Sequence, residues 1–248
     1  YSASIKYRPY QQETHINPLS KRDRLISFGG ITVNNALIPE NNTGQLGLNF
    51  DSKGNYFASY SDVLSNIFQL ELANLGSMHN AKNNIHINEK FTNTYLDKDN
   101  FNIRIGGKLL LFSPQKNDIL WTSFRTSVGR NENTNQGYIL SEIINTYRMN
   151  NWLSSNLSSK YFLSGPQKFG AIGASMYWNI SDNLQIIPEI NFLVDKNLES
   201  NRTISIRYSF DEKKSIDLYT SNAIGSQDLG QVLRSKYNRV GIKFNLLY

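Results

Sequence analysis

The sequence contains no cysteine, which excludes a disulfide scaffold, a cysteine-ligated zinc site and thiol catalysis. Long apolar runs are also missing: the longest is the four residues 109–112, whereas a transmembrane helix needs about 20. Charged residues make up only 19% of the 248 residues, against roughly 25% in an ordinary soluble domain. No proline, glycine or charge tract marks a linker, so we expect a single folded domain.

The positive charge is not concentrated. The net charge of +6 and the pI near 9.3 at first suggest a polyanionic partner. However, the basic residues are scattered, and the densest cluster, Lys21, Arg22 and Arg24, is interrupted by Asp23. A nucleic-acid-binding protein concentrates Lys and Arg on one face with interleaved aromatic residues. We therefore expect no nucleic-acid partner.

What the sequence does have is an alternation of period two, which is typical of strands. In residues 203–210, Ile204, Ile206, Tyr208 and Phe210 fall on one face and polar residues on the other. The C-terminal residues 239–248 repeat the pattern, with Leu247 as its one exception.

Further segments of this kind predict an all-β chain. Seven lie upstream of or between the two best, at residues 101–112, 119–129, 137–148, 152–163, 171–180, 184–194 and 215–222. The N-terminal third adds candidates at residues 25–34, 45–50, 55–60, 66–75 and 84–95. Because the shorter two of these are compatible with loop hairpins, we expect about 12 strands, within a range of 10 to 14.

The spacers between these segments alternate in length. From residue 113 onward, every second connection is the shorter one. Transmembrane β-barrels have short turns at one end and longer loops at the other, whereas a soluble sandwich has no reason to keep that alternation. The spacing therefore predicts an antiparallel transmembrane β-barrel.

Aromatic residues gather at two levels, as they do at the two membrane interfaces of such a barrel. Those expected near the short turns are Phe112, Tyr147, Trp152, Trp178, Phe210 and Tyr248. Those expected near the long loops are Phe101, Tyr138, Tyr161, Phe169, Phe192 and Tyr237.

The C-terminus resembles the assembly signal of bacterial outer-membrane β-barrel proteins. Its alternating apolar residues end on an aromatic residue: Val240, Ile242, Phe244, Leu246 and Tyr248. The resemblance covers residues 101–248 best and identifies no particular porin or transporter family. It implies an outer-membrane location in a Gram-negative or cyanobacterial-type envelope, with lipid and the barrel-assembly machinery as partners.

The beginning of the chain is less regular. We assign residues 24–248 to the barrel and residues 1–23 to an N-terminal segment, for which an inward plug, an edge strand and a linker all stay open. Because the sequence starts at Tyr1 without the charged and apolar regions of a signal peptide, we expect that a targeting peptide was removed or was not included.

If the apolar face contacts lipid, the polar faces line the interior. The charged residues of that inward set are Arg104, Lys108, Arg125, Glu189, Arg207, Asp217, Arg239 and Lys243. Rings of basic residues favour anions. One interpretation is therefore a narrow pore with a preference for anions. The alternative is a closed ion network in which Arg207, Arg239 and Lys243 pair with Glu189 and Asp217.

Other chemistry finds little support in the sequence. A Ser/His site on the barrel wall needs a general base, and the histidines are His15, His79 and His86, of which only His86 has the inward pattern. No phosphate-binding glycine motif and no pair of histidines at a metal-ligand spacing is present. We expect neither a cofactor nor a metal.

The leading hypothesis is thus a non-enzymatic outer-membrane channel for the passive passage of small solutes. Two alternatives remain: a lipid-modifying enzyme built around His86, and a soluble exported β protein that binds glycans through its Tyr- and Asn-rich loops.

Overall fold

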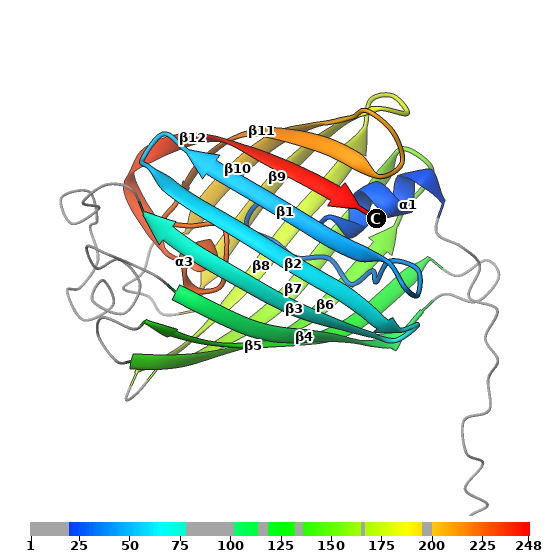
Figure 1. Ribbon diagram of the computed structural model, residues 1–248. Helices are drawn as coiled ribbons and strands as arrows, with labels where there is room; N and C mark the ends of the chain where they lie inside the picture. The colour runs from blue at the N-terminus through cyan, green and yellow to red at the C-terminus, as the bar shows by residue number, and fades with distance from the viewer. Residues whose placement is uncertain (1–19, 78–101, 114–118, 132–135, 165–166, 195–199) are drawn as a thin grey trace, which may run out of the picture.

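The computed structural model describes residues 20–77, 102–113, 119–131, 136–164, 167–194 and 200–248. Over these residues, twelve antiparallel strands form a closed barrel in which sequence neighbours pair and β1 pairs with β12 (Figure 1). The strands are β1 (Gly44–Asp51), β2 (Asn55–Ser65), β3 (Phe68–Ser77), β4 (Asn102–Phe112), β5 (Leu120–Asn131), β6 (Gln136–Arg148), β7 (Leu153–Ser164), β8 (Gln167–Asn179), β9 (Leu184–Leu193), β10 (Asn201–Ser209), β11 (Lys214–Ala223) and β12 (Arg234–Leu247). The predicted all-β barrel of about 12 strands is confirmed.

The alternation of side chains along each strand separates the two faces of the wall. In β10, Ile204, Ile206 and Tyr208 are nearly half exposed on the outside, whereas Arg207 between them is 0% exposed inside. This follows from the pleat, which points successive side chains to opposite faces. The barrel therefore has an apolar outer surface and a polar interior, as the period-two pattern predicted.

The barrel has two different ends. Short turns at residues 66–67, 149–152, 180–183 and 210–213 lie at the end where the chain terminates, here called the short-turn end. All six aromatic residues predicted there are exposed on the outer surface. At the opposite loop end, Tyr161, Phe192 and Tyr237 are also exposed. Tyr138 and Phe169 also lie near this end, but the expected place at the outer surface was wrong for both, because they are buried inside, where they stack on Phe162. Phe101 lies outside the described residues.

The strand predicted at residues 25–34 is absent. Residues 21–27 instead form α1 (Lys21–Ser27), which lies at the short-turn end (Figure 1). The Ser20 side chain caps this helix by accepting a hydrogen bond from the Asp23 N–H at 3.2 Å. The helix is followed by Gly29 with a φ of 70°, a conformation that glycine adopts without strain. The predicted strand at residues 84–95 lies outside the described residues.

After α1 the chain runs inside the barrel. Residues 28–40, here called the inner segment, carry Ile31, Val33, Ala36 and Leu37, each at most 1% exposed. Ala36 and Leu37 pack in one apolar cluster with Trp121, Ile144, Tyr177 and Ile187 of the wall. The interior is therefore filled in part by a piece of the chain that precedes β1.

A second segment enters from the loop end. Residues 224–233, here called the loop insert, connect β11 to β12 and contain the short helix α3 (Leu229–Val232). Ile224, Leu229, Val232 and Leu233 are buried in a cluster with Phe162 and other inward residues of the wall. None of the helices in the described residues is long and apolar enough to cross a membrane.

Candidate functional site in the barrel interior

The inner segment binds the wall through its own backbone. Three consecutive N–H groups, those of Ile31, Thr32 and Val33, donate to the Glu189 carboxylate at 2.8, 2.7 and 2.7 Å. Successive N–H groups that converge in this way form an anion-binding concavity. Glu189 is 4% exposed, so this contact anchors the tip of the inner segment to β9 in the middle of the barrel.

Cationic side chains of the wall bind carbonyl groups of α1 and the inner segment. The contacts are Arg207 to Leu25 O (2.5 Å) and Gly29 O (2.6 Å), Lys243 to Phe28 O (3.2 Å) and Gly30 O (3.4 Å), Lys160 to Thr32 O (2.8 Å), and Lys108 to Leu37 O (2.7 Å). Because a carbonyl is neutral, these bonds satisfy donors without cancelling the positive charge.

The loop insert is anchored by Asp228. Its carboxylate accepts hydrogen bonds from the Tyr138 hydroxyl at 2.7 Å, the Ser127 hydroxyl at 3.0 Å and the Arg104 guanidinium at 3.0 Å. Burial raises the pKa of the Asp228 carboxyl above its usual range, and the charge of Arg125 with the hydrogen bonds from Tyr138 and Ser127 counteracts that rise. The Asp228 backbone has a φ of 46°, which is uncommon for a residue other than glycine.

The two inserted segments meet in the middle of the barrel. The Lys160 ammonium donates to Thr32 O of the inner segment at 2.8 Å and to Gln231 Oε1 of the loop insert at 3.0 Å. The Asn191 amide bridges the same two residues, with its Gln231 contact at 3.0 Å and its Thr32 contact at 3.5 Å. Insertions from opposite ends thus close the side of the interior formed by β7 and β9.

All eight charged residues predicted for the interior are buried there. Arg207 pairs with Asp217 through two bonds of 2.6 and 2.7 Å, as the closed-network interpretation expected. Arg239 instead pairs with Asp51 at 2.6 Å, and Glu189 accepts the backbone N–H groups described above. The structure therefore combines one predicted ion pair with contacts to the inserted segments.

Sequence reasoning missed five charged residues of the interior: Asp51, Glu71, Glu142, Lys160 and Asp228. Glu71 and Glu142 both bind Arg125, at 2.9 and 2.6 Å. Both lie at inward positions of β3 and β6, so the period-two alternation could have predicted them as interior residues. They were overlooked because these strands are less cleanly patterned. The inward position of Asp228 could not be predicted from the alternation, because Asp228 lies in a loop that folds inward and not in a strand.

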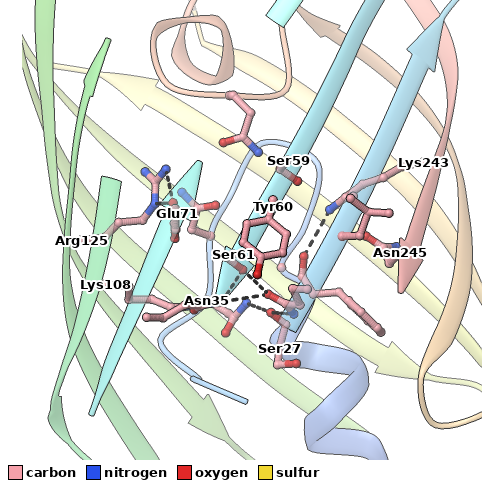
Figure 2. A pocket seen from close by; sticks show the side chains of 18 of the residues that line it. Ser27, Asn35, Ser59, Tyr60, Ser61, Glu71, Lys108, Arg125, Lys243 and Asn245 are labelled. Atoms are coloured by element: carbon pink, nitrogen blue, oxygen red, sulfur yellow. Dashed lines mark hydrogen bonds and ion pairs between the residues drawn. The ribbon is translucent and has the colours of Figure 1, made fainter. Parts of the chain in front are cut away.

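A cavity of about 80 Å³ remains on the other side of the interior. It lies between the inner segment and the wall formed by β1 to β5 and β12 (Figure 2). Its lining includes Gly47, which has no side chain, and the small side chains of Ser59 and Ser61. Its charged lining residues are Arg104, Lys108, Arg125, Lys243 and Glu71. Arg207, although inward and cationic, is not among the lining residues.

His86, the histidine considered for catalysis, lies outside the described residues, as do His15 and His79. Within the described part of the chain, no three His, Asp or Glu side chains are grouped in a way that could hold a metal ion.

Comparison with known proteins finds similarity in structure alone. No family model and no curated protein matches the sequence. Among solved structures, the KdgM porin matches with a TM-score of 0.59 at 9% identity, over 82% of this chain and 98% of the porin. The outer membrane channel COG4313 from Pseudomonas putida F1 matches with 0.55 at 9% identity, over 86% and 97%. The NanC porin matches with 0.53 at 6% identity, over 82% and 98%. The chain thus has the barrel fold of outer-membrane porins.

Proposed function

We propose that this protein is an outer-membrane β-barrel that forms a narrow channel for small solutes and prefers anions. The observation that carries the proposal is the charge of the cavity lining, which has four cations, Arg104, Lys108, Arg125 and Lys243, against the single carboxylate Glu71. Fixed positive charge beside a water-accessible passage raises the local concentration of anions. The protein is proposed as a transporter rather than an enzyme.

The positive charge of the cavity lining has to be compared with the positions of the other carboxylates in the interior. Glu142, Glu189, Asp217 and Asp228 balance much of the interior charge, but none of them is among the described residues that line the cavity. Glu142 and Asp228 nevertheless bind two of the lining cations, Arg125 and Arg104. The positive charge of the lining that no described carboxylate binds lies on Lys108 and Lys243, which contact only carbonyl groups. A solved structure of the KdgM porin, which shares the fold, is in complex with oligogalacturonate.

The outer surface supports a membrane location. Val240, Phe244 and Tyr248 of the proposed assembly signal are 62%, 43% and 54% exposed, and large apolar residues cover the neighbouring strands. A soluble protein rarely exposes so continuous an apolar surface. We therefore propose outer-membrane lipid and the barrel-assembly machinery as partners, the latter through residues 240–248.

Substituting the outer face of β12 tests the membrane location. We expect Phe244→Arg to lower the free energy of unfolding in lipid vesicles by about 2–4 kcal/mol, because the charge would sit in the middle of the apolar band. The matched control is Asn238→Arg, on the same face of the same strand but near the loop end, which should cost less than about 1 kcal/mol. Equal costs for the two variants would contradict the lipid-facing assignment.

Recordings in planar bilayers test the channel. At low salt under a salt gradient, we expect the reversal potential to shift toward the anion value, and the shift to shrink at high salt as the Debye length falls below about 10 Å. Lys108→Glu and Lys243→Glu should move it toward the cation value. Lys168→Glu, on the exposed outer face of β8, should leave it unchanged. A folded protein that conducts nothing would refute the proposal.

A further inference from the structure

Two lysines face the cavity with unused hydrogen-bond donors. Lys108 makes one hydrogen bond, to Leu37 O, and Lys243 makes two long ones, to Phe28 O and Gly30 O. An ammonium group has three donors. In the described part of the chain, neither ammonium binds a carboxylate. Figure 2 places the two lysines on opposite sides of the cavity.

Two buried polar atoms of the lining also have no partner among the described residues. They are Nε of Arg104, a donor, and Oε1 of Gln69, an acceptor, and both side chains belong to residues that are 2% exposed. Leaving a buried polar atom unpaired is costly, so natural structures rarely do so without a bound molecule or a functional reason. Both residues line the cavity, so a molecule bound there can supply the partner that each atom lacks.

The carboxylate already present does not fill this role. Glu71 binds Arg125 at 2.9 Å and Arg104 at 3.3 Å, and it makes no hydrogen bond or ion pair with either lysine in the described structure. The same guanidinium groups also bind Glu142 and Asp228, so this group of two arginines and three carboxylates has a formal charge of −1. Lys108 and Lys243 therefore supply the net positive charge at the cavity. An anion in the cavity can therefore form ion pairs with Lys108 and Lys243.

We infer that the cavity is a binding site for a small hydroxycarboxylate. Its carboxylate oxygens accept hydrogen bonds from Lys108, Lys243 and Arg104 Nε, and its hydroxyl donates to Gln69 Oε1. The inference deepens the proposed function and rests on it, because a solute bound here lies on the proposed passage. The ligand is short, since about 80 Å³ holds only several waters at roughly 10–15 Å³ each.

Calorimetric titration of the detergent-folded protein with glycolate and with acetate tests this site. The two anions differ only by the hydroxyl, so we expect glycolate to bind about tenfold more tightly than acetate. This comparison uses the unchanged protein and does not depend on how a variant folds. Equal affinities, or no measurable binding of glycolate, would overturn the inference.

Variants then assign the contacts. We expect Lys108→Gln and Lys243→Gln each to weaken glycolate binding about tenfold, and Gln69→Leu to remove the preference for glycolate over acetate. Lys168→Gln on the outer wall is the control and should bind as the unchanged protein does. Glycolate binding that survives both lysine changes in folded protein would place the ligand elsewhere and refute the site.

The titration also separates this inference from the channel. Binding in detergent requires no ion conduction, so a protein that binds glycolate but does not conduct contradicts the channel alone. A protein that conducts with anion preference but binds glycolate no better than acetate contradicts the site alone.

Discussion

Replacing Arg207 by Met is expected to lower the free energy of unfolding by about 3–5 kcal/mol, the usual cost of leaving one partner of a buried ion pair uncompensated. Arg207 and Asp217 are both 0% exposed and joined by two short bonds. The same guanidinium also donates to Leu25 O and Gly29 O, so its loss leaves carbonyl groups of α1 and its C-terminal turn unpaired as well. Denaturant unfolding of the protein in detergent measures the change.

An exposed arginine provides the comparison. Arg24 pairs with Glu40 at 2.6 Å and Glu212 at 2.7 Å, but these side chains are between about a quarter and half exposed. Arg24→Met should therefore cost less than about 1 kcal/mol. The double variant Arg207→Met with Asp217→Leu should regain part of the lost stability, because it removes both buried charges. Equal losses for Arg207→Met and Arg24→Met would show that the interior pair is hydrated.

Deleting residues 21–38 is expected to raise the single-channel conductance several-fold. These residues form α1 and most of the inner segment, which occupies the middle of the barrel. A barrel of twelve strands lies between eight-stranded barrels, whose side chains fill the interior, and open porins of 16 strands. Removing the inner segment therefore opens a passage that the wall alone does not fill. Planar-bilayer recordings provide the measurement.

A single substitution that weakens the anchor of the inner segment should also raise the conductance. Glu189→Gln removes the charge that three backbone N–H groups of the inner segment share, so we expect brief transitions to the larger conductance. Asp211→Asn, at the exposed turn before β11, is the matched control and should record as the unchanged protein does. Unaltered conductance in the deletion variant would mean that the inner segment does not limit the flow of ions.

The barrel wall of this structure could be predicted from the sequence, because outward and inward positions alternate without exception in strands such as β10. The two ends and the burial of the eight charged residues followed from that alternation. The strand number agreed for another reason: the two short segments at residues 45–50 and 55–60, which the count treated as loop hairpins, are the wall strands β1 and β2, whereas residues 25–34, which it included, form no strand. The strand predicted at residues 25–34 failed for a physical reason. Its apolar residues are buried in the interior rather than placed on the outer surface, and composition alone does not distinguish these two locations.

Apolar residues at inward strand positions were the one indication in the sequence that the interior is partly filled. Leu247 breaks the pattern of the last strand, and it is buried inside against Leu25 and Phe28. Ile144 and Ile187 are likewise apolar at inward positions, where they contact the inner segment. Apolar residues on the polar face of a barrel strand indicate that something apolar fills the interior. Which segment fills it was not predictable, because contacts between distant residues leave no local pattern.

The pairing of β1 with β12 has a consequence for the order in which the molecule folds. The inner segment leads directly into β1, and Leu247 of β12 both pairs with Gln45 and packs on Leu25 and Phe28. While this seam is open, the inner segment has a sideways route into the interior; once the seam has closed, it can leave only lengthwise. We therefore expect the inner segment to enter the barrel more readily before β1 and β12 pair, because afterwards only the lengthwise route through the end of the barrel remains.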